Sequence, residues 1–160
     1  MKLTFEPNLE YQQEAIGAVV GLFEGQMLED SDYRYGMQED GQFDFIDGVG
    51  NHLALTDEQI LANLQKVQEQ NEVPVSELLD GMHFSVEMET GTGKTYVYLR
   101  TIYELNNRYG FKKFVIVVPS VPIREGVLKN LQITHEHFQT LYDNIPVNYK
   151  VYDRNRISQL

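Results

Sequence analysis

The spacing of apolar residues predicts three well-defined helices. One covers residues 8–23 and one covers residues 94–109. A third covers residues 57–71 and begins behind Thr56 and Gln59, which have the spacing of a capping box. In each of these segments apolar side chains recur three or four positions apart, so that one face of the helix is suited to a core.

Short apolar runs between these helices predict strands. Residues 83–88 read HFSVEM, residues 114–118 read FVIVV, and residues 147–152 form a third run. The middle run has the uniformly apolar character of a strand that is buried on both faces of a parallel sheet. Two further helices are expected at residues 123–131 and 134–142. Because strands and helices alternate, we expect an α/β fold with a mostly parallel sheet flanked by helices.

Residues 26–55 fit neither period. They combine acidic side chains, scattered glycines and two short apolar runs, which predict a loosely structured insertion that contains a hairpin or a mobile loop. Because they offer little apolar surface to offset the entropy of ordering, we expect them to be the least ordered part of the chain. We therefore divide the single expected domain, residues 1–160, into residues 8–25, an acidic insertion at 26–80, and residues 81–160.

Charge divides the chain of 160 residues unevenly. The net charge of −11 argues against nucleic-acid binding, since phosphate backbones are held mainly by Lys and Arg. However, residues 1–80 hold 3 basic and 17 acidic side chains, whereas residues 81–160 hold 10 and 7, so the second half is mildly basic. The absence of cysteine fits a reducing compartment. No signal peptide and no apolar run of the roughly 20 residues that cross a bilayer is apparent, and we expect a soluble, cytoplasmic chain with no membrane partner.

A glycine-rich stretch, Gly-Thr-Gly-Lys-Thr, lies between a predicted strand and a predicted helix, which is the context of a P-loop. Its glycines allow backbone N–H groups to face phosphate oxygens, and the helix N-terminus adds partial positive charge. We expect Lys94 to reach the β and γ phosphates of ATP and Thr95 to ligate Mg²⁺, so these two are the catalytic candidates. The phosphate-binding candidates are Gly91, Thr92, Gly93, Lys94 and Thr95. Met88 stands where the strict pattern has glycine, and the alternative is a glycine-rich turn that caps a helix.

Two more segments suggest binding chemistry. In YQQEAI, the carboxamide of Gln12 can accept from and donate to the edge of adenine, although a polar helix face is the alternative. In VVPSVPIREGV, Ser120 follows a predicted strand and precedes a predicted helix, so it is a candidate contact to nucleic-acid phosphate. An ordinary strand-to-helix turn is the alternative there. His135 and His137 diverge on a helix, cannot share a metal, and are expected on a solvated face.

Together these segments resemble a known family. The form ETGTGKT, without a glycine at its head, is similar to the P-loop of superfamily 2 helicases and translocases. The glutamine element, the insertion and the form METGTGKTYVY resemble the N-terminal part of the restriction subunit, Res, of type III restriction-modification enzymes, over nearly the whole chain. This resemblance implies an ATP-dependent DNA translocase or helicase-like endonuclease that cleaves foreign duplex DNA together with a Mod methyltransferase subunit.

The resemblance also implies a longer protein. Its fold is expected to be an incomplete RecA-like P-loop NTPase domain, because a Walker B motif, a second RecA-like domain and nuclease carboxylates have no match in this sequence. The chain alone is therefore expected to bind ATP weakly and to be inactive as an enzyme. Two alternatives stay open: another superfamily 2 enzyme, such as a type I restriction motor or an RNA helicase, and a small P-loop phosphotransferase or nucleotide-binding module.

Overall fold

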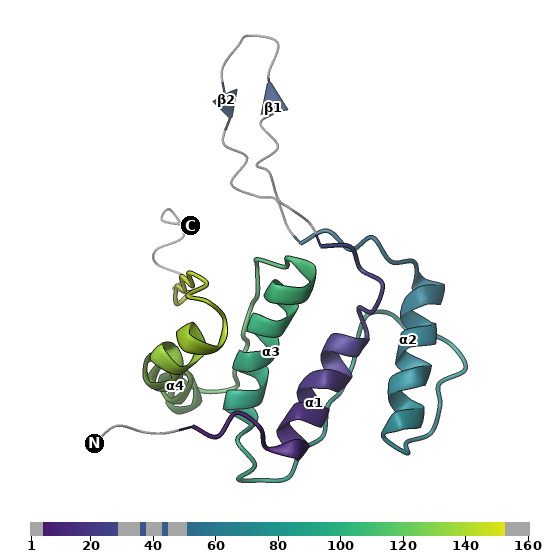
Figure 1. Ribbon diagram of the computed structural model, residues 1–160, viewed down its shortest axis with the longest axis horizontal. Helices are drawn as coiled ribbons and strands as arrows, with labels where there is room; N and C mark the ends of the chain where they lie inside the picture. The colour runs from purple at the N-terminus through teal and green to yellow at the C-terminus, as the bar shows by residue number, and fades with distance from the viewer. Residues whose placement is uncertain (1–4, 29–35, 38–42, 45–50, 153–160) are drawn as a thin grey trace.

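Four helices stand side by side in the part of the chain that the structure describes, residues 5–28, 36–37, 43–44 and 51–152 of a computed structural model. They are α1 (Glu10–Gly21), α2 (Asp57–Gln70), α3 (Lys94–Tyr109) and α4 (Val121–Leu141). Their order in space is α2, α1, α3, α4, so that α1 packs against both α2 and α3, and α3 also packs against α4 (Figure 1). The helix that follows the glycine-rich loop is therefore central to the layer.

The predicted parallel sheet is wrong for the described residues. The paired strands there are β1 (Gly36–Met37) and β2 (Phe43–Asp44), which form an antiparallel pair. The three apolar runs expected as strands, and with them the mostly parallel sheet of a RecA-like domain, show no strand pairing in these residues.

The reason is that a strand exists only where a neighbouring strand completes its backbone hydrogen bonds. Apolar composition supplies no such neighbour. In the run expected at the centre of the sheet, Val115 is 89% exposed and Val117 is 87% exposed, so neither side chain is buried as a central strand requires.

Residues 26–55, which the sequence predicts to form a loosely structured insertion, are only partly described. Of the two alternatives given for it, the pairing of β1 with β2 matches the hairpin. Residues 29–35, 38–42 and 45–50 lie outside the described residues. The prediction that residues 26–55 are the least ordered part of the chain concerns mostly these residues.

Two amide side chains tie the ends of this region to the helical layer. Gln26 is buried, donates to the carbonyl oxygen of His52 at 3.2 Å, and accepts from the N–H of Ala54 at 2.9 Å. The Asn51 side chain accepts from the N–H groups of Lys112 and Lys113 at 2.8 and 3.0 Å, and donates to the Lys113 carbonyl at 2.7 Å. The segments that flank residues 29–50 are thus held close to each other and to the chain after α3.

Local sequence signals explain the helix ends. The capping box before α2 is present, since the Thr56 hydroxyl accepts from the Gln59 N–H at 3.4 Å and the Gln59 side chain accepts from the Thr56 N–H at 2.9 Å. The predicted bounds of α3 are confirmed. Helix α1 is shorter at both ends than the expected 8–23, since it spans Glu10–Gly21 with Leu9 as its N-cap. The two helices expected at 123–131 and 134–142 form the single helix α4, because nothing between them breaks a helix.

Two apolar clusters form the core. The first joins α1 to α3, and its buried members are Ile16, Val20, Val97, Leu105 and Phe111. The second joins α3 to α4, and its buried members are Tyr96, Leu99, Tyr103, Phe138 and Tyr142. Because α3 contributes to both clusters, it links the two halves of the layer.

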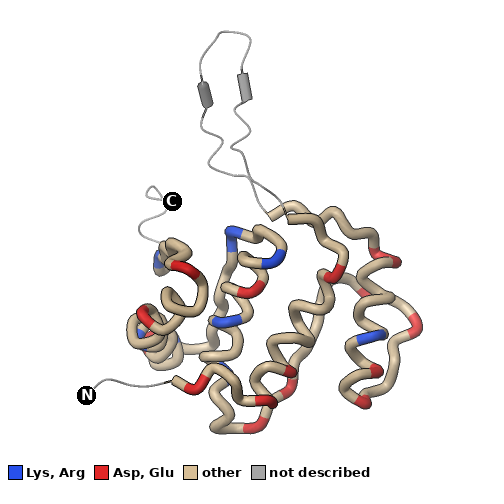
Figure 2. Tube along the Cα trace, in the orientation of Figure 1, with Lys and Arg blue, Asp and Glu red and all other residues tan. Residues whose placement is uncertain are grey.

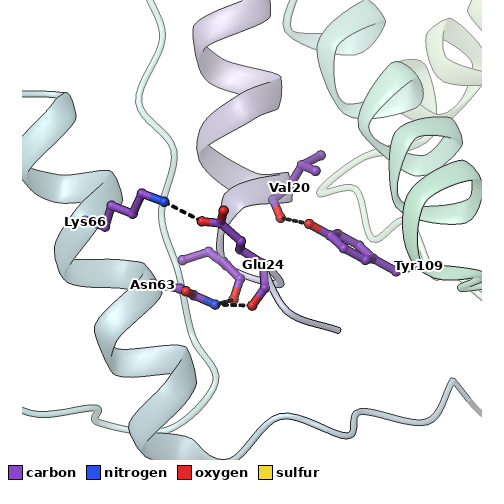
Figure 3. Close-up of polar contacts among 6 residues, drawn as sticks. Val20, Glu24, Asn63, Lys66 and Tyr109 are labelled. Atoms are coloured by element: carbon purple, nitrogen blue, oxygen red, sulfur yellow. Dashed lines mark hydrogen bonds and ion pairs between the residues drawn. The ribbon is translucent and has the colours of Figure 1, made fainter. Parts of the chain in front are cut away.

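Polar contacts fix the C-terminal end of α1 from both sides (Figure 3). From α2, the Asn63 amide donates to the carbonyl oxygens of Leu22 and Glu24 at 3.0 and 2.9 Å, and Lys66 pairs with the Glu24 carboxylate at 2.6 Å. From α3, the Tyr109 hydroxyl donates to the Val20 carbonyl at 3.1 Å. The Leu22 and Glu24 carbonyls lie beyond the last residue of α1 and are satisfied by Asn63, whereas the Val20 carbonyl also accepts from the Phe23 N–H at 3.1 Å.

His137 departs from the solvated face expected for it. It is half-buried on α4, its Nε2 lies 2.8 Å from the Tyr96 hydroxyl, and its ring lies 5.2 Å from that of Phe5. Burial, with a smaller contribution from the Arg100 charge, holds the pKa of His137 below its usual value. His135 on the same helix is exposed.

We expect His137 to make the fold less stable in mild acid. The unfolded chain binds a proton on His137 near about pH 6.5, whereas the folded chain binds it only at lower pH, so the free energy of unfolding falls as pH drops through that value. Thermal unfolding between about pH 7.5 and 5.5 should show a smaller loss of Tm for His137→Gln than for the wild-type chain. His135→Gln is the matched control and should follow the wild type. An equal pH dependence in His137→Gln and wild type would contradict the assignment.

Candidate functional site

The loop before α3 has the backbone of an anion-binding turn. Gly91 and Gly93 have φ values of 84° and 85°, a left-handed conformation that favours glycine. The Thr92 hydroxyl donates to the Glu89 carbonyl at 2.7 Å and closes the turn. Since α3 starts at Lys94, the first N–H groups of the helix have no intrahelical acceptor and are available to an anion.

Space and charge around the loop suit a phosphate group. A Cβ placed on Gly91 would meet no atom within 4 Å, so this side of the loop is open. The Lys94 side chain is exposed and makes no ion pair with a carboxylate of the described residues. An incoming phosphate would therefore meet an uncompensated positive charge beside the N-terminus of α3.

Gln12 lies against this loop although 80 positions separate it from Thr92. Its side chain is only 6% exposed, and its Nε2 donates to the Thr92 carbonyl at 2.9 Å. Because a carbonyl can only accept, this contact fixes which end of the carboxamide faces the loop. The structure thus brings together two motifs that the sequence identified separately.

The Gln12 carboxamide keeps capacity for a ligand. Its Oε1 accepts no hydrogen bond from the described residues, and no buried side-chain oxygen or nitrogen there lacks a partner, so Oε1 is reachable by solvent. The second N–H of Nε2 also remains. One acceptor and one donor side by side are what a bidentate contact to an adenine edge requires.

Thr95 lies in the first turn of α3 and is half-buried. Burial raises the pKa of Tyr98, and the neighbouring Thr95 acts in the opposite direction. No group of three or more His, Asp or Glu residues suited to a metal occurs in the described part. The Thr95 hydroxyl is one group that could ligate a magnesium ion at this loop, beside phosphate oxygens and water, a ligand set that Mg²⁺ accepts.

Ser120 lies elsewhere. It is the N-cap of α4, it is exposed, and its side chain makes no capping hydrogen bond. Within the described residues it has no hydrogen bond to the loop before α3. The hydroxyl and the N-terminus of α4 are both exposed, and among the described residues it is Gln12, not Ser120, that is hydrogen-bonded to the loop.

A long open groove of about 1120 Å³ ends at the loop. It runs between α1, α2 and residues 83–92, and Tyr11, Glu14, Gly91 and Thr92 are among the residues that line it. Charged residues are distributed unevenly along the chain: most Asp and Glu positions lie on α1, α2 and their connections, whereas most Lys and Arg positions lie on α3, α4 and the segment between them (Figure 2).

Sequence reasoning missed Arg100. It lies on α3 with only 8% of its surface exposed; its Nε donates to the Tyr142 hydroxyl at 3.1 Å and its Nη1 donates to the Pro7 carbonyl. The available signal was its position four residues after Tyr96, on the buried face of the helix. A charged residue at such a position needs specific partners.

No helix within the described ranges combines the length and apolar character needed to span a membrane.

Comparison with known proteins gives consistent matches. Residues 7–158 match the family model described as type III restriction enzyme, res subunit. The chain is 36% identical over 153 residues to the type III restriction-modification enzyme EcoPI Res subunit of Escherichia phage P1. It is 31% identical over 150 residues to the EcoP15I Res subunit of Escherichia coli, and 48% identical over 67 residues to the StyLTI Res subunit of Salmonella typhimurium.

These relatives are much longer than this chain. The EcoPI alignment covers 92% of this chain and 15% of that protein, and the EcoP15I alignment covers 87% and 14%. The StyLTI alignment covers 41% and 7%.

We expect Gly93→Ala to displace the Gln12 side chain and Gly91→Ala to leave it in place. A Cβ on Gly93 would lie 2.7 Å from Gln12 Nε2, whereas a Cβ on Gly91 meets nothing. Both glycines are left-handed, so both variants should lose roughly 1–2 kcal/mol of unfolding free energy through backbone strain. Denaturant unfolding measures that shared loss. The side-chain amide signals of Gln12 in a ¹H–¹⁵N spectrum should shift only in Gly93→Ala, and an equal shift in both variants would contradict the contact.

Proposed function

Because the chain belongs to the Res-subunit family of type III restriction enzymes, we propose that it forms the ATP-binding part of an ATP-dependent restriction endonuclease that translocates on DNA or acts like a helicase. The observation that carries this proposal is the hydrogen bond between Gln12 and Thr92. It holds the side chain proposed to read the base against the loop proposed to bind phosphate. The family match also decides against the type I motor, the RNA helicase and the small phosphotransferase that the sequence left open.

The nucleotide would lie along the loop before α3. The N–H groups of Gly93, Lys94 and the first turn of α3 face its phosphates, and the Lys94 ammonium neutralises the charge of the β and γ groups. Gln12 pairs with the adenine edge through Oε1 and the free N–H of Nε2. Mg²⁺, held in part by Thr95, supplies further charge neutralisation at the phosphates.

The whole protein would act on foreign duplex DNA in the cytoplasm together with a Mod methyltransferase subunit. This rests on the names of the relatives, which are Res subunits of restriction-modification enzymes. Lys and Arg residues are concentrated on α3, α4 and the segment between them (Figure 2), and the exposed ones, such as Lys112 and Lys129, support a DNA-facing surface there. Ser120 and the N-terminus of α4 would contact a DNA phosphate. In this assignment residues 8–25 bind the base, 26–80 are an insertion, and 81–160 bind phosphate and DNA.

We expect Lys94→Ala to abolish binding of Mg·ATP to the purified chain. The variant removes the exposed ammonium beside the loop, and we expect the packing of α3 to stay unchanged because Lys94 is not among the buried residues of that helix. Isothermal titration calorimetry with a non-hydrolysable ATP analogue measures the loss. Lys129→Ala on α4 removes another exposed lysine and should bind like the wild type. Failure of the wild type to bind, or equal binding by Lys94→Ala, would overturn the proposed site.

A further inference from the structure

Arg100 connects three parts of the fold that are distant in sequence. It lies on α3, at most 8% of its surface is exposed, and its guanidinium donates in two directions. One direction leads to the Tyr142 hydroxyl at the end of α4, and the other leads to the Pro7 carbonyl in the segment before α1. A single cationic group therefore holds the start of one helix and the end of another against the helix that follows the loop.

The Pro7 carbonyl is the junction on the α1 side. It also accepts from the Gln13 side chain, which lies in the first turn of α1. In the same turn the Leu9 carbonyl accepts from the backbone N–H groups of Gln12 and Gln13, both at 3.0 Å. The position of Pro7 thus sets the position of the first turn of α1, and with it the Cα of Gln12.

These contacts close a ring. From Arg100 the ring passes through Pro7 to the first turn of α1, then through the Gln12 side chain to Thr92, and back along α3. Two of its members are joined through α3: Arg100 lies on this helix, whose rise per residue is fixed, and Thr92 lies two residues before the helix begins. Hence the position of Gln12 relative to the loop depends on the hydrogen bond that Arg100 donates to Pro7.

The buried charge of Arg100 is compensated within the same network. The Tyr142 hydroxyl accepts from Arg100 Nε and donates to the Glu104 carboxylate at 2.7 Å. Burial and the hydrogen bond to Glu104 raise the pKa of Tyr142, so the hydroxyl keeps the proton that it donates. A planar guanidinium can serve Pro7 and Tyr142 at once, which a lysine ammonium on a single flexible stem does less well.

We propose that Arg100 is a positioning residue that holds Gln12 against the phosphate-binding loop and thereby sets the preference of the site for adenine over guanine nucleotides. This inference rests on the proposed function, since it assumes that Gln12 reads the base. It assigns Arg100 no contact with the nucleotide. Its effect should therefore be seen in base preference, while the affinity that comes from the phosphates stays with Lys94 and the loop.

The test compares the Kd values of Mg·ATP and Mg·GTP analogues for four forms of the purified chain by calorimetry. Arg100→Gln keeps a polar group for Tyr142 but is too short to reach Pro7, and Gln12→Ala removes the base-reading group itself. Arg108→Met is the matched control, because Arg108 lies on the same helix and pairs with the same Glu104 at 3.0 Å but is exposed. The fourth form is the wild type.

We expect Arg100→Gln to lose about tenfold or more of the ATP preference, approaching Gln12→Ala, since a bidentate amide contact carries discrimination of that order. Its GTP affinity and the behaviour of Arg108→Met should stay close to wild type. An unchanged preference in Arg100→Gln, or an equal loss for both nucleotides, would overturn the positioning role while leaving the proposed function intact. If the wild type binds neither nucleotide, the proposed function fails and the inference fails with it.

A measurement on the unaltered chain covers the case in which Arg100→Gln does not fold. In ¹H–¹⁵N spectra, the Arg100 Nε–H and the Gln12 side-chain amide should shift together when the ATP analogue is added. The GTP analogue should move the amides of the loop but leave these two signals unchanged. A shift of Gln12 with ATP and none at Arg100 would refute the coupling.

Discussion

The packing of α1 against α3 is the constraint on which the rest of the structure depends. Ile16 and Val20 of α1 meet Val97 and Leu105 of α3 in a buried apolar cluster. This burial presses the two helices together without fixing how far one slides along the other, because the hydrophobic effect is not directional. Directional contacts at the two ends supply that information, from Gln12 at one end and Tyr109 at the other.

The other two helices depend on this pair. Helix α2 packs against α1. Gly21 allows these two helices to approach each other closely, since a Cβ there would lie 3.1 Å from a methyl group of Val67. Helix α4 reaches it through α3, across a set of aromatic rings such as Tyr103 and Phe138, whose centroids are 4.8 Å apart. A glycine on one side and large aromatic rings on the other show that the two outer contacts are built in different ways.

The sequence predicted those features that depend on nearby residues. The start of α2 follows from Thr56 and Gln59, and the start and end of α3 follow from Gly93 and Gly110, because capping and left-handed turns involve only a few neighbouring positions. The parallel sheet was not predictable in this way. A run such as residues 114–118 has the composition of a strand, but pairing depends on a partner that composition does not specify.

The residues of the candidate site also fall into those with a local sequence signal and those that depend on distant partners. The loop and Gln12 could be identified from short motifs, and the structure places them in contact, although their roles with a nucleotide stay predictions. The burial of Arg100 could be inferred from its spacing after Tyr96, but its partners could not, because Pro7 and Tyr142 lie 93 and 42 positions away and no motif links them to it. Contacts between distant residues carry little local signal, and they are found only once the helices have been placed.

The anchoring of the insertion has a consequence for how the chain can be altered. Gln26 and Asn51 hold the segments on either side of residues 29–50 with hydrogen bonds that involve none of those residues. These hydrogen bonds do not depend on how many residues lie between the two anchors. The region is therefore a natural place for length variation during evolution, and a suitable point at which to insert an affinity tag or a reporter domain.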